Sequence, residues 1–192
     1  MHKDEMWQLY YPNGEPIEGA GWLAAKDNPS GADVEIVGVA VVFLFRVRED
    51  GEIELLWQRR SESIDRYPGD YDISAGGHIN LGESLTQGAV RECREEIGVE
   101  VALEDLRLVT ERGFNKNRLA WVYAVDFSGR EETFHFDDNE VSEVRWVPLT
   151  ETEEFRMKYA KAPLKKDRLT FELLGEWLRM YGYIKDEQDE RK

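Results

Sequence analysis

The segment Val34–Val47 limits the fold most, because its middle is apolar at consecutive positions. It reads V-E-I-V-G-V-A-V-V-F-L-F-R-V. A strand with one face in water alternates apolar and polar residues, whereas an unbroken run rich in valine and phenylalanine is typical of a strand covered on both faces. The chain is therefore expected to build a sheet around this segment and to cover both faces of that sheet.

The rest of the pattern supplies the neighbours of this strand. Glu49 to Glu52 has the composition of a turn, so Ile53–Arg60 is expected to return as the second arm of a hairpin. A loop over Ser61–Gly69 leads to a short strand at Tyr71–Ser74. Further strands are expected at 106–111, 119–127 and 141–147, and helices at 84–97, 150–160 and 167–183. Strands before and after a helix, with helices closing the chain, predict an α/β (α+β) fold in which a mixed sheet lies between helices.

The chain ends differ from its middle. Residues 1–33 are rich in turn formers and are expected to form a hairpin or irregular segment that packs on the domain through Trp7, Leu9, Tyr10 and Trp22. Residues 34–184 are expected to form one domain, since no linker divides them. Residues 185–192 read as a flexible charged tail.

Composition excludes several classes of function. The net charge of −15 would repel long nucleic acids, although a bound metal and a few arginines can still attract a small phosphorylated ligand. No apolar run approaches the roughly 20 residues of a membrane span, and the first residues lack the apolar core of a secretory signal. The single cysteine, Cys93, cannot form an intramolecular disulfide. Cytoplasmic residence is the default expectation, and a homodimer paired through residues 1–33 remains open.

The stretch Gly77–Val99 carries the chemistry. It combines a glycine turn with an expected helix on which Glu92, Glu95 and Glu96 stand at i, i+3 and i+4, and thus on one face. Like charges at this spacing repel each other, so stability alone does not explain them. Carboxylate oxygens are the ligands that hard cations prefer, which points to Mg²⁺, with Mn²⁺ as the alternative.

This stretch resembles the signature of the Nudix hydrolase superfamily. The matching residues are Gly77, Glu83, Arg91, Glu92, Glu95, Glu96, Gly98 and Val99. Cys93 departs from the pattern mildly, since it occupies an aliphatic position and cysteine packs as a small apolar residue. The resemblance implies an α/β/α sandwich and a metal-dependent attack of water on a diphosphate.

The resemblance also implies roles for individual residues. Metal ions would be held by Glu92, Glu95, Glu96 and the carbonyl of Gly76. Arg91 would orient the glutamates and Glu83 would hold the loop, while Gly77 and Gly98 are structural positions of the motif.

A further carboxylate from a later loop often serves such sites as a base or an extra ligand. Glu140 is the first choice here and Glu143 its rival, although the acidic run Asp137–Glu140 also reads as a solvated loop. Whether Glu92 or Glu140 is the general base stays open.

The flanking sequence resembles one subgroup of the superfamily, which includes the isopentenyl-diphosphate isomerases. Those isomerases carry a catalytic cysteine two residues before the loop histidine, and here Gly76 precedes His78. They also use histidines from the preceding strands, yet this chain has none between His2 and His78. Hydrolysis is therefore the favoured activity, and an isomerase-like enzyme or a non-catalytic ligand sensor are the alternatives.

The expected substrate is a small nucleoside-diphosphate derivative or another organic diphosphate. His78 could donate to a phosphate or could brace the loop. Arg59 is favoured over Arg60 as a phosphate ligand, since alternation sends the two to opposite faces. Tyr67 could stack on a base, and Arg112 could border the pocket, although a surface position is the stronger reading of Arg112. The sequence names neither the leaving moiety nor the phosphorus that is attacked.

Overall fold

Strand β3 (Ile36–Val47) is the central strand of the sheet, in agreement with the sequence pattern. The computed structural model describes residues 6–23, 36–115, 118–137 and 139–185. On one side β3 pairs in parallel with β8 (Arg118–Asp126). On its other side it pairs antiparallel with three strands in turn, β1 (Met6–Tyr10), β6 (Ala75–His78) and β4 (Ile53–Arg60).

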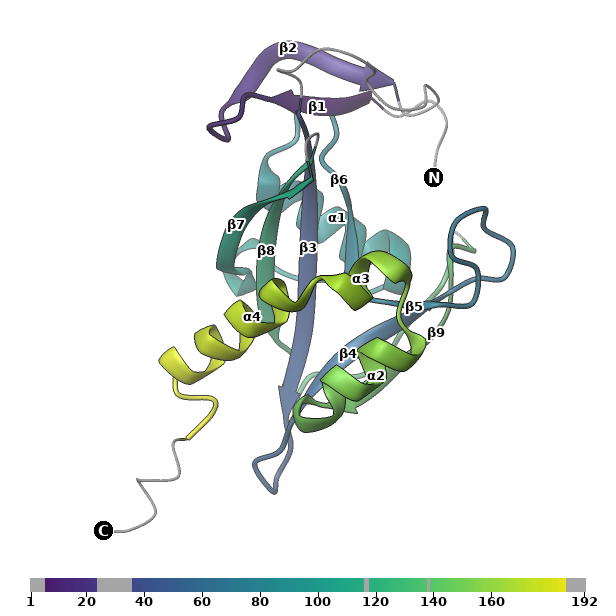
Figure 1. Ribbon diagram of the computed structural model, residues 1–192, viewed down its shortest axis with the longest axis vertical. Coiled ribbons are helices and arrows are strands. Elements are labelled where there is room, and N and C mark those ends of the chain that lie inside the picture. Colours follow the sequence, from purple (N-terminus) through teal and green to yellow (C-terminus); the bar gives the residue numbers. More distant parts are fainter. Residues whose placement is uncertain (1–5, 24–35, 116–117, 138, 186–192) are drawn as a thin grey trace.

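The remaining strands extend this sheet. Strand β4 pairs with β5 (Tyr71–Asp72) and β9 (Val141–Pro148), and β8 pairs with β7 (Arg107–Asn115). Strands β1 and β2 (Pro16–Leu23) form the hairpin expected near the N-terminus. Figure 1 shows this hairpin across the upper end of the sheet, where β1 is hydrogen-bonded to the start of β3.

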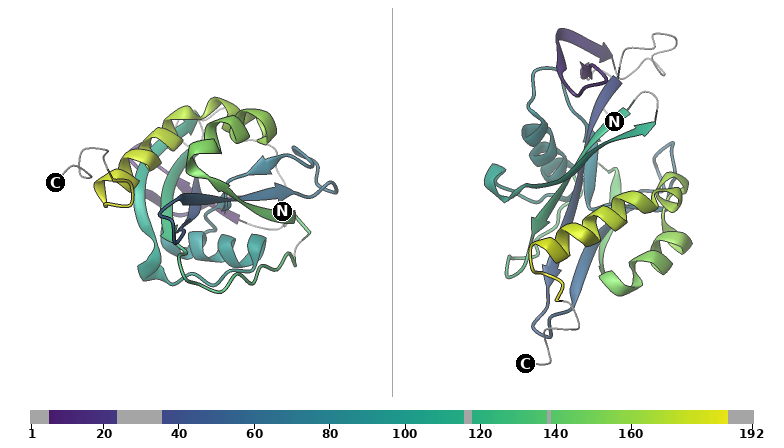
Figure 2. Two further views of the ribbon diagram at one scale, coloured as in Figure 1. Left: turned by 90° about the horizontal axis from the view of Figure 1, so that it is seen from below. Right: turned by 60° about the vertical axis from the view of Figure 1, so that its left-hand side comes forward.

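Helices cover both faces of the sheet, so the expected α/β/α sandwich is confirmed (Figure 2). Helix α1 (Leu85–Ile97) packs on the face of Ala40, Val42 and Leu44. The other face, with Val41, Phe43 and Phe45, is covered by the C-terminal helices. These are α2 (Thr152–Tyr159), α3 (Ala162–Lys166) and α4 (Arg168–Met180). The alternation of β3 between two apolar clusters explains its continuous hydrophobicity.

Some elements differ from expectation. The glycine turn at the start of the Gly77–Val99 signature (the box) belongs to strand β6, which pairs with β3. This strand was not expected, because four residues with two glycines give no periodic signal. Helix α3 was also not expected, and single turns of 3-10 helix lie at Leu103–Asp105 and Leu149–Glu151. The side chain of Trp22 and residues 186–192 lie outside the description. Among the described residues, no helix combines the length and the apolar character that crossing a membrane requires.

Candidate functional site

Both ends of helix α1 are fixed by local sequence. Ser84 is the N-cap, whose hydroxyl accepts from the Gln87 N–H while the Gln87 side chain accepts from the Ser84 N–H. This reciprocal capping box satisfies N–H groups that a helix start leaves open. Gly98 ends the helix with a φ of 69°, a left-handed conformation that favours glycine. The caps fix where α1 begins and ends, and its apolar residues Ala89, Cys93 and Ile97 pack on the sheet.

Two of the three box carboxylates lie directly against strand β6. The Oε2 of Glu96 accepts a hydrogen bond from the Gly76 N–H at 2.8 Å and from the Gln58 Nε2 at 3.0 Å. The Glu92 carboxylate fills the space where a side chain at position 77 would be, since a Cβ on Gly77 would come within 2.2 Å of its Oε1. The absence of a side chain at Gly77 therefore lets the helix and the Glu92 carboxylate approach the strand, while Gly76 contributes its backbone N–H.

Among the described residues, no basic side chain forms an ion pair with Glu96. Burial first, and then the charge of Glu92, raise the pKa of Glu96 well above the ordinary value of a glutamate. Asp72 adds a further negative charge nearby, while the two hydrogen-bond donors to Glu96 are neutral. A bound cation would remove this unfavourable concentration of negative charge.

Arg91 joins the start of the box to its helix. Its guanidinium donates to Glu83 at 2.8 Å, to Glu92 at 2.8 Å, to Glu95 at 2.9 Å and to the carbonyl of His78 at 2.8 Å. The planar fork of an arginine suits several acceptors at once. Arg91 therefore sets the distance between the β6 loop and the carboxylate face of α1.

The donor set fits a hard divalent cation in its chemistry. Every candidate ligand is an oxygen atom, and Glu92 and Glu96 converge on the same two glycines. Within the described parts of the chain, no three His, Cys, Asp or Glu side chains stand close enough to enclose an ion. Glu92 and Glu95 both accept from the Arg91 guanidinium, at 2.8 and 2.9 Å, whereas Glu96 is bonded to Gln58 and Gly76. An ion held by all three carboxylates would have to compete with Arg91 for Glu92 and Glu95.

His78 lies on the other face of the sheet, away from α1. Its register partner is Val39, and its ring stacks on Trp7 of the hairpin with centroids 3.6 Å apart and an interplanar angle of 7°. Burial, followed by the charges of Arg118, Arg91 and Arg66, lowers the pKa of His78 to about 3. The imidazole is therefore neutral near pH 7 and packed under the hairpin.

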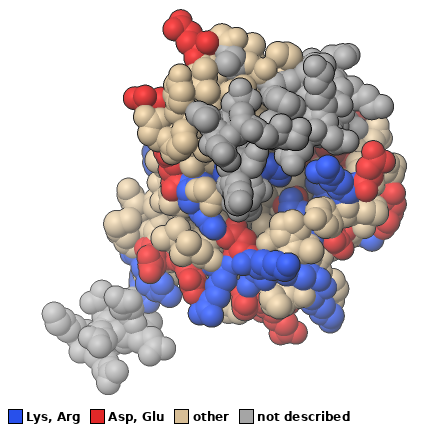
Figure 3. Space-filling model, turned by 45° about the horizontal axis from the view of Figure 1, so that its top comes forward, with Lys and Arg blue, Asp and Glu red and all other residues tan. Residues whose placement is uncertain are grey.

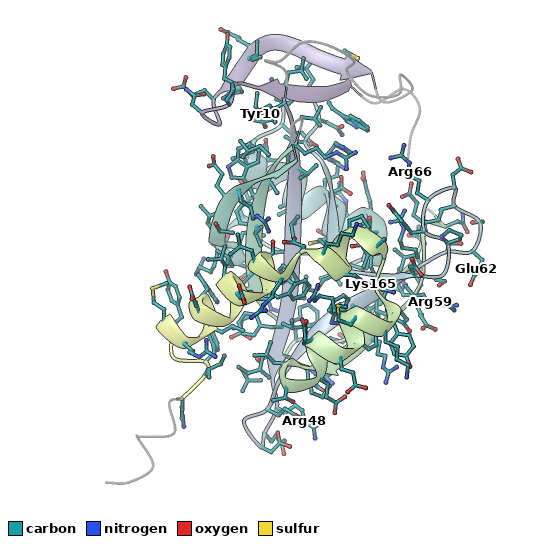
Figure 4. All side chains as sticks on the ribbon, viewed as in Figure 1. Tyr10, Arg48, Arg59, Glu62, Arg66 and Lys165 are labelled. Carbon is teal, nitrogen blue, oxygen red and sulfur yellow. The ribbon has the colours of Figure 1, made fainter. Side chains whose placement is uncertain are left out.

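The structure does not bring Arg59 or Arg112 to the carboxylates. Alternation along β4 turns Arg59 away from Gln58, and its guanidinium pairs with Glu62 at 2.9 Å in the neighbouring loop (Figure 4). Arg112 reaches Asp167 and Thr170 at the start of α4. Tyr67 lies in the β4–β5 loop with a φ of 53° and an exposed ring.

The two rival carboxylates lie near the end of β4. The carbonyl of Glu140 accepts from the Ser61 N–H at 2.8 Å. Glu143 stands opposite Arg59 in the β4–β9 ladder and accepts from the Tyr71 hydroxyl. Glu143 therefore belongs to the face covered by α2, which is opposite to that of Glu96.

Two residues of this site were not anticipated from the sequence. Gln58 faces α1, like Leu56 two positions earlier, and its contact with Glu96 was hidden because the two are 38 residues apart. Asp72 is opposite Gln58 in the sheet, and it is buried with Lys161 and Arg60 as ionic partners. The alternation of side chains along β4 could have predicted that Gln58 faces α1, whereas no local sequence pattern indicated the position of Asp72.

Comparisons with known proteins identify relatives of this chain by sequence. The NUDIX domain family model matches residues 36–168. "Nudix hydrolase 3" of Arabidopsis thaliana is 33% identical over 143 residues, which are 69% of this chain and 18% of that protein. An isopentenyl-diphosphate Delta-isomerase of Shigella flexneri is 30% identical over 105 residues, 51% of this chain and 56% of that enzyme. The chain thus spans only a part of the length of these relatives.

Solved structures resemble the fold. DR0079 from Deinococcus radiodurans has a TM-score of 0.63 at 23% identity, covering 92% of this chain and 98% of that one. The NUDIX domain of Shewanella oneidensis NrtR, solved in complex with ADP ribose, has a TM-score of 0.58 at 21% identity, covering 80% and 95%. At these identities the likeness concerns the fold alone.

Proposed function

Because the chain belongs to the Nudix family, we propose that it is a Mg²⁺-dependent hydrolase. Its substrate would be a small nucleoside-diphosphate derivative or another organic diphosphate, cleaved by attack of water at phosphorus. The observation that carries the proposal is the packing of the Glu92 and Glu96 carboxylates against Gly77 and Gly76, where Arg91 pairs with Glu92 but no basic side chain of the described residues pairs with the buried Glu96.

The first role proposed is that of the metal ligands. Glu92, Glu95, Glu96 and the Gly76 carbonyl would hold the metal. When bound there, a divalent ion would supply neutralisation of the phosphate oxygens and a lowered pKa of the attacking water.

Hydrogen bonds from neighbouring groups would keep these ligands in place. Gln58 and the Gly76 N–H orient Glu96, and Arg91 orients Glu92 while tying it to Glu83. Glu92 and Glu140 are the candidates for the general base, and a variant of each would decide between them.

An isomerase-like reaction is the less favoured function, because position 76 has no room for the cysteine it needs. A Cβ on Gly76 would lie 2.8 Å from the backbone carbonyl oxygen of Ala40 and 3.0 Å from the Cδ1 of Ile73. A backbone carbonyl cannot rotate away as a side chain can. The similarity to isomerases therefore supports a common ancestry of the fold more than a common reaction.

The test is hydrolysis of a substrate panel with and without Mg²⁺. Nucleotide sugars, ADP ribose, dinucleoside polyphosphates, oxidised nucleotides and isoprenyl diphosphates would be offered, and phosphate release measured after phosphatase treatment. Glu95→Gln and Glu96→Gln should each lower kcat by about 100-fold or more, since electrostatic stabilisation supplies most of the rate of such reactions. Reaction in ¹⁸O-labelled water would then identify the phosphorus attacked.

Glu100→Gln is the matched control, because Glu100 is exposed just beyond the box and should be dispensable. Turnover in the presence of a metal chelator, or full activity in both box variants, would contradict the proposal. Tight binding of a panel compound with no turnover in Mg²⁺ would instead identify a ligand sensor.

A further inference from the structure

The sheet face opposite α1 carries a group of polar residues beneath the β1–β2 hairpin. Trp7 stacks on His78 and forms an antiparallel bridge with Asn80. Bridged residues share a face of a sheet, as do residues two apart along a strand. Trp7, His78 and Asn80 therefore point to the same side, away from the box carboxylates.

Within the part of the chain that the structure describes, one polar atom of each of these residues is buried without a hydrogen-bond partner. These atoms are the Nε1 of Trp7, the Nε2 of His78 and the Oδ1 of Asn80. Native proteins pair nearly all buried polar groups, so an unpaired group indicates a missing water, ion or ligand. Three such atoms on one face point to an occupant that offers both donors and acceptors.

Two arginines lie around the same place. Arg118 opens β8 opposite Val37, and His78 pairs with Val39, so the alternation of β3 puts Arg118 and His78 on one face. Arg66 projects from the β4–β5 loop toward this end of the molecule (Figure 4). The charges of both arginines lower the pKa of His78, and Arg66 also contributes to the lowered pKa of the half-buried Arg118.

Neither arginine is neutralised within the described parts of the chain, where no acidic side chain lies within ion-pair distance of either. This is unexpected in a protein with 40 acidic residues and 25 basic ones. Figure 3 shows Lys and Arg side chains on the face below the hairpin, with Asp and Glu side chains among them. Arg118 is half-buried, and a partly buried cation without a counter-ion is costly, so an anion is the complementary occupant beside it. Arg66 is exposed and would add its positive charge from the solvent side.

We propose that Trp7, His78, Asn80, Arg66 and Arg118 bind a phosphate group carried by the substrate in addition to its scissile diphosphate. The assignment to the substrate rests on the proposed function, and it is supported by the position of His78 on the same strand, β6, as Gly76 and Gly77, which contact Glu96 and Glu92. The preferred substrates would then be organic diphosphates with a third phosphate on the leaving moiety.

The chemistry of each residue suits this ligand. The guanidiniums supply charge and N–H donors, and the indole N–H of Trp7 donates to a phosphate oxygen. Asn80 accepts from a hydroxyl of the group that bears the phosphate. The neutral His78 can donate or accept at Nε2, depending on its tautomer.

The first test is calorimetric titration of the full chain with inorganic phosphate in the presence of a metal chelator. Without metal the box carboxylates repel phosphate, so one saturable site of about millimolar affinity is expected. Arg118→Gln and Arg66→Gln should each weaken it about tenfold, the usual effect of losing a charge-assisted hydrogen bond. Trp7→Phe keeps an aromatic ring, although a smaller one, and removes the indole N–H, and it should weaken phosphate binding a few-fold.

Arg48→Gln is the matched control, because Arg48 is paired with acidic residues at the far end of the molecule (Figure 4). Circular dichroism would verify that each variant is folded. Absence of saturable phosphate binding, or equal affinity in wild type and both arginine variants, overturns the proposal. So does a crystal structure soaked in phosphate with only water at the three polar atoms.

A second test separates this subsite from catalysis. Diphosphate substrates would be compared in pairs that differ by one phosphate on the leaving moiety. Arg118→Gln should raise KM about tenfold only for the member with the extra phosphate and leave kcat unchanged. An equal effect on both members would contradict the assignment. Phosphate binding without any turnover would refute the proposed function while leaving the anion subsite intact.

Discussion

The Nε2 of Gln58 donates a hydrogen bond to the Oε2 of Glu96 at 3.0 Å, across 38 residues of sequence. Both side chains are buried, with exposed fractions of 1% and 7%. The same oxygen of Glu96 also accepts from the Gly76 N–H. The rotamer of the most buried box carboxylate is thus fixed by β4 and β6 before any ligand binds.

Gln58→Leu should weaken the binding of Mn²⁺ to the free protein by about tenfold, because groups that hydrogen-bond to the ligands of a metal hold those ligands in position. Electron paramagnetic resonance of free Mn²⁺ would measure the affinity directly. Gln87→Leu is the control, since it removes the capping box of α1 and should cost about 1 kcal/mol of stability without touching Glu96. Equal Mn²⁺ affinities in wild type and Gln58→Leu would show that the hydrogen bond from Gln58 does not orient Glu96 for metal binding.

Arg91→Lys should impair both stability and turnover, although it preserves the charge. A lysine cannot reach Glu83, Glu92, Glu95 and the His78 carbonyl together, so several buried acceptors would lose a donor. A loss of about 2 kcal/mol or more in the free energy of unfolding is expected from urea titration. Arg94→Lys, on the exposed side of the same helix, should change little. Similar losses in both variants would argue against a special role of Arg91.

His78 should make the fold less stable as the pH falls. Its pKa is about 3 in the folded chain and near the ordinary value of 6.5 in the unfolded chain, so below pH 6.5 the unfolded state takes up a proton that the folded state does not. The contribution of the neutral His78 to the free energy of unfolding is complete above pH 6.5 and is lost as the pH falls. The free energy of unfolding should decrease by at most about 1.4 kcal/mol per pH unit from this group. Urea titrations between pH 7.5 and 4.5 should show a shallower dependence in His78→Phe. His135→Phe, at an exposed histidine, should follow the wild type.

Asp167→Asn tests whether Arg112 stabilises the fold or binds the substrate. Asp167 is buried at the N-cap of α4, where it accepts from Thr170 and pairs with Arg112. Breaking a buried ion pair costs about 3–5 kcal/mol. The melting temperature should therefore fall while KM stays unchanged at a temperature where the variant is folded. A large rise in KM would instead connect this contact to the substrate.

Local patterns were sufficient for most elements of the fold. The apolar run became β3, the hairpin arm became β4 at Ile53–Arg60 as expected, and the box helix begins and ends at its caps. These elements are long and periodic, so local preference and tertiary packing agree on them. Strand β6 and helix α3 were missed because each is only four or five residues long and owes its conformation to β3 and β5.

The candidate site was predictable only in part. Glu92 and Glu96 were marked by helical spacing, and the structure brings them together at Gly76–Gly77. The expectation for His78 left two roles open, and the structure packs its ring against Trp7. No local pattern could show that contact, since the hairpin and β6 meet only when the sheet forms.

By itself, the sequence determined which helical face carries the carboxylates and which strand lies at the centre, because both follow from the repeat of side chains along one element. Only the tertiary structure decided what surrounds those carboxylates. Gln58, Gly76 and Asp72 meet Glu96 through the pairing of β3, β4, β5 and β6. The electrostatic field at a buried charge depends on the groups that surround it in space. Here those groups are distant in the sequence, so no local pattern could reveal them.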